Sequence, residues 1–292
     1  MTSTPFLDDR AVGRSLVAGR GLAAPPALLY GTAWKEDDTE ALVALALSAG
    51  FRGIDTANQR KHYVEAGVGG ALTAALATGA VRREELFIQT KYTFARGQDH
   101  RLPYDPAAPV ATQVRQSFER SQQHLGLHFI DSLVLHGPMQ AGHLHALDYE
   151  AWRAMEALVE DGLVGSLGIS NVEATQVSEL VAFARVAPRF VQNRCYANQG
   201  WDAKVRSVCR QNGVVYQGFS LLTANRQVLA GQTVRQLAAR YDVTPAQVVF
   251  RFAQLMEMLP LTGTRDPQHM RDDLAALRLP LTKGDVQAIQ LG

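Results

Sequence analysis

The sequence predicts a single (β/α)₈ barrel, and three observations support this fold class. Short apolar runs alternate with segments of helical periodicity, and eight such units follow one another from about residue 27 onward. No Pro-, Gly- or Ser-rich linker divides the 292 residues, and one barrel typically needs about 250. The G-x-G-x-x-G turn of an open, doubly wound sheet, which is the alternative architecture, is absent.

The eight predicted strands are short apolar runs bounded by turn residues, the pattern of parallel strands that are buried on both faces. They are expected at 27–30, 50–54, 86–90, 132–135, 166–169, 190–193, 214–220 and 259–263. We expect residues 1–26 to form an N-terminal extension and residues 27–292 to form the barrel domain.

Segments of helical periodicity connect these strands. After Pro109, for example, Val110, Val114 and Phe118 share one face, and Gly126 follows the last turn. The other helices are expected from Asp37–Asp38 onward, near 65–79, near 149–161, to about 185 with Ser170 and Asn171 as the cap, after capping boxes at 233–236 and 244–247, from Asp266 onward, and over 281–290. The connection 92–108 is long, aromatic and proline-rich, which is typical of a functional loop.

Composition argues against several classes of partner. The formal net charge is +1, from 29 basic and 28 acidic residues, so neither nucleic acid nor an anionic membrane is an expected partner. No apolar run approaches the length of a membrane span, and the charged start of the chain does not resemble a signal peptide. Cys195 and Cys209 lack metal-site spacing and are expected to be buried thiols, so we expect a cytoplasmic protein without a metal.

Polar residues stand where three of the predicted strands end: Asp55, Lys91 and His136. The carboxyl ends of parallel barrel strands meet at one mouth, where barrel enzymes do their chemistry. A buried Lys91 needs a partner, and Asp55 supplies one. With Tyr63 on the next loop, we expect Lys91 to lower the phenol pKa and make Tyr63 a general acid for a carbonyl oxygen. His136 would give that oxygen a second hydrogen bond.

Each of these residues also has an ordinary structural interpretation. Tyr63 alone is compatible with a packed loop aromatic, and His136 with a satisfied structural histidine. Asp55 and Lys91 are compatible with an ion pair that only supports the barrel. The repetition of the same pattern at three strand ends favours an active site over these alternatives.

The chain resembles the aldo-keto reductases over residues 27–290. The family pattern Gly-Phe/Tyr-Arg-x-x-Asp-Thr-Ala is present at 50–57, the lysine strand at 88–91 and the histidine strand at 132–138. Residues 168–172 resemble the Gly-x-Ser-Asn that holds the nicotinamide carboxamide. Gln192 matches the family's glutamine, and residues 31–34 are similar to its Gly-Thr-Trp.

This resemblance implies a barrel that binds NADP(H) without a Rossmann motif and passes hydride to a small-molecule carbonyl substrate. It implies a catalytic tetrad of Asp55, Tyr63, Lys91 and His136. The cofactor-binding residues that it implies are Gly31, Thr32, Asp55, Ser170, Asn171, Gln192, Phe219, Ser220, Leu222, Gly263, Thr264, Arg265, His269 and Asp273. Phe219 replaces the usual tyrosine stacked on the nicotinamide, a change that keeps the ring face. The substrate pocket is expected to include Trp34, Tyr92 and Gly137.

Three departures from the family pattern bear on function. The catalytic tyrosine normally follows the aspartate by five residues, but Arg60 stands there, and we interpret 60–62 as an insertion before Tyr63. Gly263 and His269 stand where the family has the lysine and arginine that grip the 2′-phosphate. Arg265 is a possible substitute, so NADPH is the expected cofactor and NADH an open alternative. Gly137 replaces a bulky residue and widens the pocket.

Two functions of other classes stay open. One is a regulatory protein that binds the nucleotide with little turnover. The other is a barrel lyase that uses Lys91 as a Schiff-base amine. The sequence reveals neither the substrate nor the oligomeric state, for which we expect a monomer or weak homo-oligomer.

Overall fold

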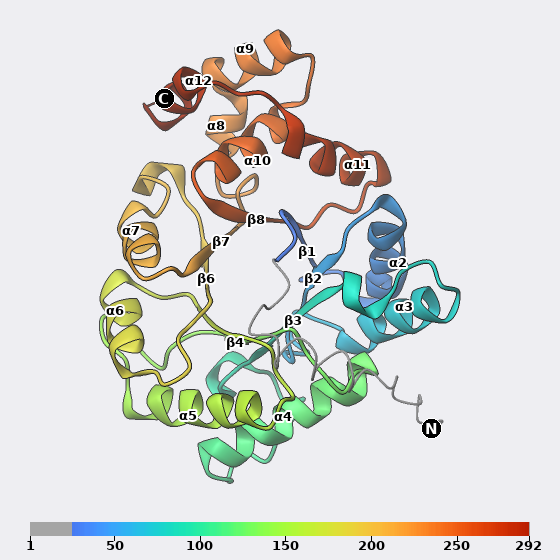
Figure 1. The fold of residues 1–292 in the computed structure, drawn as a ribbon, viewed down its shortest axis with the longest axis vertical. Helices are drawn as coiled ribbons and strands as arrows, with labels where there is room; N and C mark the ends of the chain where they lie inside the picture. Colours follow the sequence, from blue (N-terminus) through green and yellow to red (C-terminus); the bar gives the residue numbers. More distant parts are fainter. Residues whose placement is uncertain (1–24, 292) are drawn as a thin grey trace.

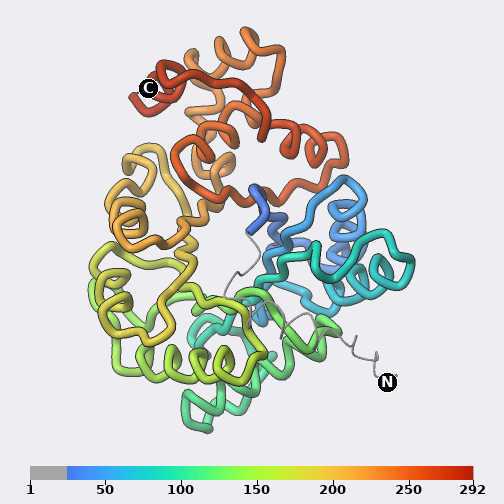
Figure 2. The backbone as a smooth tube through the Cα atoms, viewed as in Figure 1, coloured from blue at the N-terminus to red at the C-terminus, as the bar shows by residue number. Residues whose placement is uncertain are grey.

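The computed structural model describes residues 25–291, which form a closed barrel of eight parallel strands (Figure 1). The strands are β1 Leu29–Gly31, β2 Gly53–Asp55, β3 Phe87–Tyr92, β4 Ser132–Leu135, β5 Leu167–Ser170, β6 Phe190–Arg194, β7 Val215–Phe219 and β8 Met258–Thr262. Each pairs with its neighbour in the chain, and β1 pairs with β8 to close the ring. The blue segment of β1 therefore lies beside the orange-red segment of β8 (Figure 2). The predicted fold class is confirmed, and every strand overlaps its predicted range.

Helices surround the strands and cover their outer faces (Figure 1). The α-helices are α2 Thr39–Ala49, α3 Glu65–Ala77, α4 Val110–Leu125, α5 Ala146–Glu160, α6 Ala174–Phe183, α7 Ala203–Gln211, α8 Arg226–Ala230, α9 Gln232–Tyr241, α10 Pro245–Leu255, α11 Pro267–Ala275 and α12 Lys283–Leu291. Short 3₁₀ turns are η1 Glu36–Asp38, η2 Arg83–Glu85, η3 Ala95–Gly97, η4 Ala197–Gln199 and η5 Ala276–Arg278. Helices α9 and α12 pack together beside α10, outside the regular ring.

Local sequence explains several helix ends. Helix α4 begins after Pro109 and ends at Gly126, whose φ of +69° favours glycine. The predicted capping box before α10 forms, since the Thr244 hydroxyl accepts a hydrogen bond from the backbone amide of Gln247 at 3.2 Å. Asp266 caps α11 in the same way.

Two local predictions are wrong, and two helices were not predicted. Helix α9 begins at Gln232, so Thr233 lies inside the helix and its predicted capping box is not formed. Glu173, not Ser170 or Asn171, caps α6, because Ser170 still belongs to β5. Helix α7 was not predicted, although Val205, Val208 and Cys209 follow helical spacing and two of them are buried. Helix α8 was not predicted either, and it has only five residues, none of them buried.

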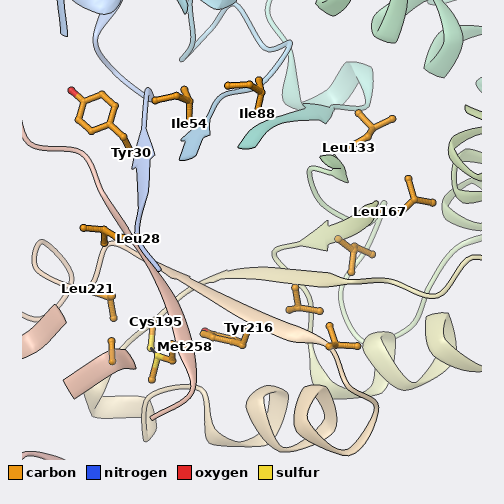
Figure 3. Close-up of a cluster of buried hydrophobic side chains, with 14 of the residues drawn as sticks. Leu28, Tyr30, Ile54, Ile88, Leu133, Leu167, Cys195, Tyr216, Leu221 and Met258 are labelled. Atoms are coloured by element: carbon orange, nitrogen blue, oxygen red, sulfur yellow. Dashed lines mark hydrogen bonds between the residues drawn. The ribbon is translucent and has the colours of Figure 1, made fainter. Parts of the chain in front are cut away.

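Apolar side chains form two layers because residues alternate across each strand. The outer layer packs strands against helices and includes Tyr30, Ile54, Ile88 and Leu133 (Figure 3). The inner layer fills the amino-terminal part of the barrel and consists of Leu29, Phe87, Phe190, Leu259 and Leu261. The carboxyl-terminal part of the interior is left for polar residues.

Gly53 shows how the chain before β1 fits the barrel. A Cβ atom at this position would lie 2.3 Å from Cγ of Pro26 and 2.5 Å from Cδ2 of Leu29. Only glycine allows this approach, so Pro26 packs against the barrel even though the predicted extension was to include it. The rest of that extension, residues 1–24, lies outside the described residues.

Candidate active site

Three polar side chains reach the barrel interior from neighbouring strands. Asp55 ends β2, Lys91 is the fifth residue of β3, and His136 follows β4 directly. Asp55 and Lys91 are 3% and 1% exposed. Such burial requires that the carboxylate and the ammonium group be paired.

The pairing is a direct contact. Lys91 Nζ lies 2.7 Å from Asp55 Oδ2 and donates a second hydrogen bond to the backbone oxygen of Thr56 at 2.8 Å. Burial lowers the pKa of Lys91, while the neighbouring Asp55 carboxylate favours the charged ammonium form. The predicted proximity of these two groups is therefore present.

Two glutamines bond to the other oxygen of Asp55, and a third joins them. Gln89 Nε2 and Gln192 Nε2 donate to Asp55 Oδ1 at 2.6 and 3.0 Å. Both amides also donate to Gln217 Oε1 at 2.9 Å, and Gln217 returns a bond to Gln89 Oε1. This amide network fixes the Asp55 carboxylate as a hydrogen-bond acceptor. Sequence reasoning missed Gln89 and Gln217, although a polar residue inside an apolar strand was the available signal.

Tyr63 reaches this cluster from the loop after β2. The backbone oxygen of Gln59 accepts hydrogen bonds from the amides of His62 and Tyr63 at 3.0 Å, which closes a turn around the extra residues. Lys91 Nζ lies 5.2 Å from the centroid of the Tyr63 ring, and the His136 ring centroid lies 5.9 Å from it. Tyr63 thus lies beside the other three polar residues despite its unusual spacing.

The expected lowering of the Tyr63 pKa is not found. Burial raises the pKa of the phenol above its usual value, and the negative charge of Asp55 raises it further. Sequence reasoning considered only the lysine charge and could not weigh it against desolvation. The hydroxyl is consequently protonated at neutral pH.

His136 is held as a neutral imidazole. Burial, assisted by the charges of Lys91 and His62, lowers its pKa well below the usual range. Its Nδ1 lies 2.7 Å from the hydroxyl oxygen of Thr93. When that hydroxyl donates to Nδ1, the ring proton is on Nε2, the nitrogen available to an oxygen in the cavity. Thr93 was not predicted as a site residue.

A cavity of about 510 Å³ opens above this cluster and extends toward β8 and α11. Its lining is Gly31, Ala33, Asp55, Tyr63, His136, Ser170, Gln192, Phe219, Ser220, Leu221, Leu222, Thr223, Thr244, Ala246, Phe250, Leu261, Thr262, Gly263, Thr264, His269, Asp272 and Asp273. Eleven of the predicted cofactor-binding residues are in this set, since only Thr32, Asn171 and Arg265 are not. One cavity therefore joins the Tyr63 region to the predicted nucleotide-binding segment.

The three exceptions have other partners. The Thr32 hydroxyl is fully buried and donates to the backbone oxygen of Asp55. The side-chain amide of Asn171 donates to the backbone oxygen of His136 at 2.7 Å and to Ser170 Oγ at 3.1 Å. The guanidinium group of Arg265 bonds to Asp38.

None of the predicted substrate-pocket residues belongs to the cavity lining. Trp34 is 63% exposed and stacks on His62, with ring centroids 3.9 Å apart. Gly137 lies beside Asn171 near the cavity mouth. Tyr92 faces the opposite side of β3 from Lys91, and its hydroxyl donates to Gln113 Oε1 at 3.2 Å. The structure places Tyr92 in the outer core and not at the cavity, because neighbouring strand residues point to opposite faces.

Lys35 is a further residue that sequence reasoning did not assign. It is 2% exposed and donates to the backbone oxygen of Gly263 at 2.7 Å. Burial, with a contribution from nearby Arg265, lowers its pKa to about 8. This buried cation is bonded to the wall of the cavity through Gly263, whereas in the sequence a single lysine after Trp34 resembles an ordinary surface residue.

Within residues 25–291, the structure contains neither a candidate metal site nor a candidate membrane-spanning helix. No three His, Cys, Asp or Glu side chains in this part of the chain are grouped so that they could hold a metal ion. Every helix described there is too short or too polar to span a lipid bilayer.

The fold and the site together define a parallel barrel whose mouth presents a tyrosine and a histidine over a buried lysine–aspartate pair. The chain belongs to the aldo/keto reductase family, whose model matches residues 27–291. Its class is that of oxidoreductases acting on carbonyl compounds, for which NAD(P)H is the general cofactor.

Several characterised or named proteins are similar to it. Methylglyoxal reductase DkgA of Salmonella typhimurium is 29% identical over 267 residues, covering 88% of this chain and 86% of the relative. 2,5-Diketo-D-gluconic acid reductase B of a Corynebacterium species is 29% identical over 277 residues, covering 94% and 91%. Aldose reductase of Schistosoma japonicum has the same fold, with a TM-score of 0.79 at 23% identity over 92% of this chain and 89% of its own.

Proposed function

We propose that this protein reduces an aldehyde or ketone to an alcohol with hydride from NAD(P)H, and that Tyr63 is the general acid. The observation that carries the proposal is the meeting of Tyr63 and His136 at one cavity above the Asp55–Lys91 pair. Both residues can donate a hydrogen bond to the same carbonyl oxygen from the cavity wall.

The raised pKa of Tyr63 agrees with a role as an acid. A phenol that is protonated at neutral pH has a proton to give when negative charge develops on the substrate oxygen. Lys91 lies near enough to stabilise the phenolate that this transfer leaves. Asp55, with its amide donors, keeps the Lys91 ammonium group in place. The bound cofactor supplies the hydride.

The residues present fit a nicotinamide cofactor. The Nε2 of Gln192 is committed to Asp55 and Gln217, so Oε1 is left as an acceptor for a carboxamide N–H. Ser170 also borders the cavity, and Asn171 lies beside it. Phe219 offers an apolar ring face, and Ser220 with Leu222 extends the wall toward β8.

The substrate is a small carbonyl compound in this proposal. Gly137 beside the cavity mouth leaves room that a larger residue would fill. Two relatives carry names that specify methylglyoxal and a diketogluconic acid, so small compounds with more than one carbonyl group belong in the first substrate panel. We further propose a cytoplasmic protein that acts as a monomer or weak homo-oligomer.

No observation favours the lyase alternative. The side chain of Lys91 has no exposed surface and its Nζ is bonded to Asp55 and Thr56. A Schiff base requires an amine that the substrate can reach. Measured turnover of an aldehyde would support the reductase, whereas nucleotide binding without turnover would support a regulatory protein.

The test is NAD(P)H consumption with an aldehyde panel by the wild type and Tyr63→Phe. Loss of one general acid is expected to lower turnover by about 10²–10⁴-fold, while nucleotide binding persists. Tyr149→Phe is the matched control, because Tyr149 packs on Phe183 outside the cavity. Full turnover by Tyr63→Phe would show that another group donates the proton.

A further inference from the structure

The two ends of the cavity differ in charge. The end at β2–β4 contains Asp55, Tyr63 and His136, and Lys91 balances the Asp55 carboxylate there. The end at β8–α11 is lined by His269, Asp272 and Asp273. The lining of this cavity, within the described chain, includes two carboxylates at the β8–α11 end and no lysine or arginine.

The chemistry assigns the adenosine to the β8–α11 end. Hydride transfer requires the nicotinamide beside Tyr63, so the adenosine half of the dinucleotide follows the cavity toward α11. NADPH differs from NADH only by the 2′-phosphate on the adenosine ribose. A phosphate monoester carries a charge of about −1.5 to −2 near pH 7. The charges at this end therefore decide between the two cofactors.

The amino terminus of α11 is already occupied by a carboxylate of the chain itself. Asp266 Oδ1 accepts hydrogen bonds from the backbone amides of Gln268 and His269 at 2.7 and 3.0 Å. A helix amino terminus attracts phosphate through such free amides. Here Asp266 uses these donors and adds a negative charge, so the terminus does not favour a second anion.

Two cations that adjoin lining residues at this end are also engaged. The Arg265 guanidinium group lies 2.7 Å from Asp38 Oδ2 and donates to the backbone oxygen of Trp34 at 2.8 Å. Lys35 Nζ is bonded to the backbone oxygen of Gly263. A 2′-phosphate would have to compete for these groups, whereas a 2′-hydroxyl requires no cation.

The carboxylates suit a hydroxyl. Asp272 Oδ1 accepts from Gln268 Nε2 at 2.8 Å, and no described residue donates a hydrogen bond to its Oδ2. Asp273 Oδ2 accepts from the Thr262 hydroxyl at 2.7 Å. An ionised carboxylate accepts hydrogen bonds from ribose hydroxyls and repels phosphate.

We infer that this end of the cavity selects NADH over NADPH and that Asp272 is a specificity-determining residue. This inference rests on the proposed function. It differs from the preference for NADPH that the family resemblance implies.

The test is direct binding, measured by tryptophan fluorescence or calorimetry, of NADH and NADPH at the same ionic strength. We expect NADH to bind at least about tenfold more tightly, since like-charge contacts are costly at a binding site. High salt should narrow the difference by screening it. Equal or tighter NADPH binding that Arg265→Ala abolishes would overturn the inference and show that Arg265 leaves Asp38 for the phosphate.

Two variants sharpen the assignment. Asp272→Asn removes the charge without changing the shape, and we expect NADPH affinity to rise several-fold while NADH affinity changes little. Asp161→Asn, which makes the same charge change at an exposed ion pair with Arg115, should alter neither. An unchanged NADPH affinity in Asp272→Asn would overturn the role of Asp272.

The failure of this inference can be told from failure of the proposed function. If both nucleotides bind and support aldehyde reduction but NADPH binds better, only the cofactor selection is wrong. If neither nucleotide binds, the reductase proposal and the selection both fail.

Discussion

Two buried carboxylates on opposite sides of the same barrel strand invite comparison. Thr90 and Lys91 are consecutive in β3, and they point to opposite faces. Thr90 points outward and donates to Glu65 on α3, whereas Lys91 points inward to Asp55. Glu65 also accepts from Ser121 Oγ at 3.1 Å. Both carboxylates are at least 95% buried and surrounded by donors.

The difference between them lies in what adjoins the cluster. Asp55 lines the cavity that also contains Tyr63 and His136, while Glu65 is enclosed between α3, α4 and β3 and does not line that cavity. Burial and pairing alone therefore do not distinguish a site that acts on a ligand from a polar network that joins helices. The cavity does.

The largest expected effect comes from breaking the inner pair. Lys91→Met removes the cation beside Tyr63, and we expect turnover to fall by about 10³-fold. The lone Asp55 carboxylate should also lower the free energy of unfolding by about 3 kcal/mol. Steady-state turnover and urea unfolding measure the two effects.

A double variant separates the catalytic role of this pair from a supporting one. Asp55→Asn with Lys91→Met leaves no unpaired charge, so much of the lost stability should return while turnover stays low. Recovered turnover in this stable variant would mean that Asp55 and Lys91 only support the barrel.

An intermediate effect is expected from the outer carboxylate. Glu65→Gln keeps the shape but turns one acceptor into a donor facing Ser121 and His124, so the free energy of unfolding should fall by about 1–3 kcal/mol. Turnover per folded molecule should stay within about twofold, because Glu65 does not line the cavity. Glu160→Gln on α5 is the surface control. A loss of turnover like that of Lys91→Met would remove the distinction between the two clusters.

Residues of β3 illustrate which parts of the site the sequence predicts. Polar residues at strand ends predicted Asp55, Lys91 and His136, because parallel strands bring their carboxyl ends together. The period of two also placed Tyr92 on the outer face, so its assignment to the substrate pocket disregarded a signal that was present.

Other features depend on distances that the sequence does not contain. The amide network joins strands far apart in the chain, because Gln89 and Gln217 are separated by 128 positions in the sequence. The pKa of Tyr63 is raised by burial of the phenol and by the negative charge of Asp55. The spacing of these residues in the sequence reveals neither effect. Helix α8 spans only five residues, which is too short for a helical period to show in the sequence.

The smallest expected effect concerns a residue that acts through His136. Thr93→Val is nearly isosteric and removes only the hydroxyl at 2.7 Å from Nδ1, so Nε2 is no longer favoured as the protonated nitrogen. We expect kcat to fall about tenfold. The KM for the aldehyde and the Kd for the nucleotide should stay at their wild-type values. If the substitution disordered the whole site, both constants would rise as well.

Thr93→Ser is the matched control, because it restores the hydroxyl while removing only a methyl group. Its kcat should return toward the wild-type value if the hydrogen bond, and not the packing of the side chain, sets the orientation and tautomer of His136. The backbone oxygen of Thr93 keeps its bond from the Tyr104 hydroxyl in both variants, so the loop after β3 stays anchored. An unchanged kcat in Thr93→Val would show that His136 needs no partner at Nδ1, and that the cavity wall alone orients its ring.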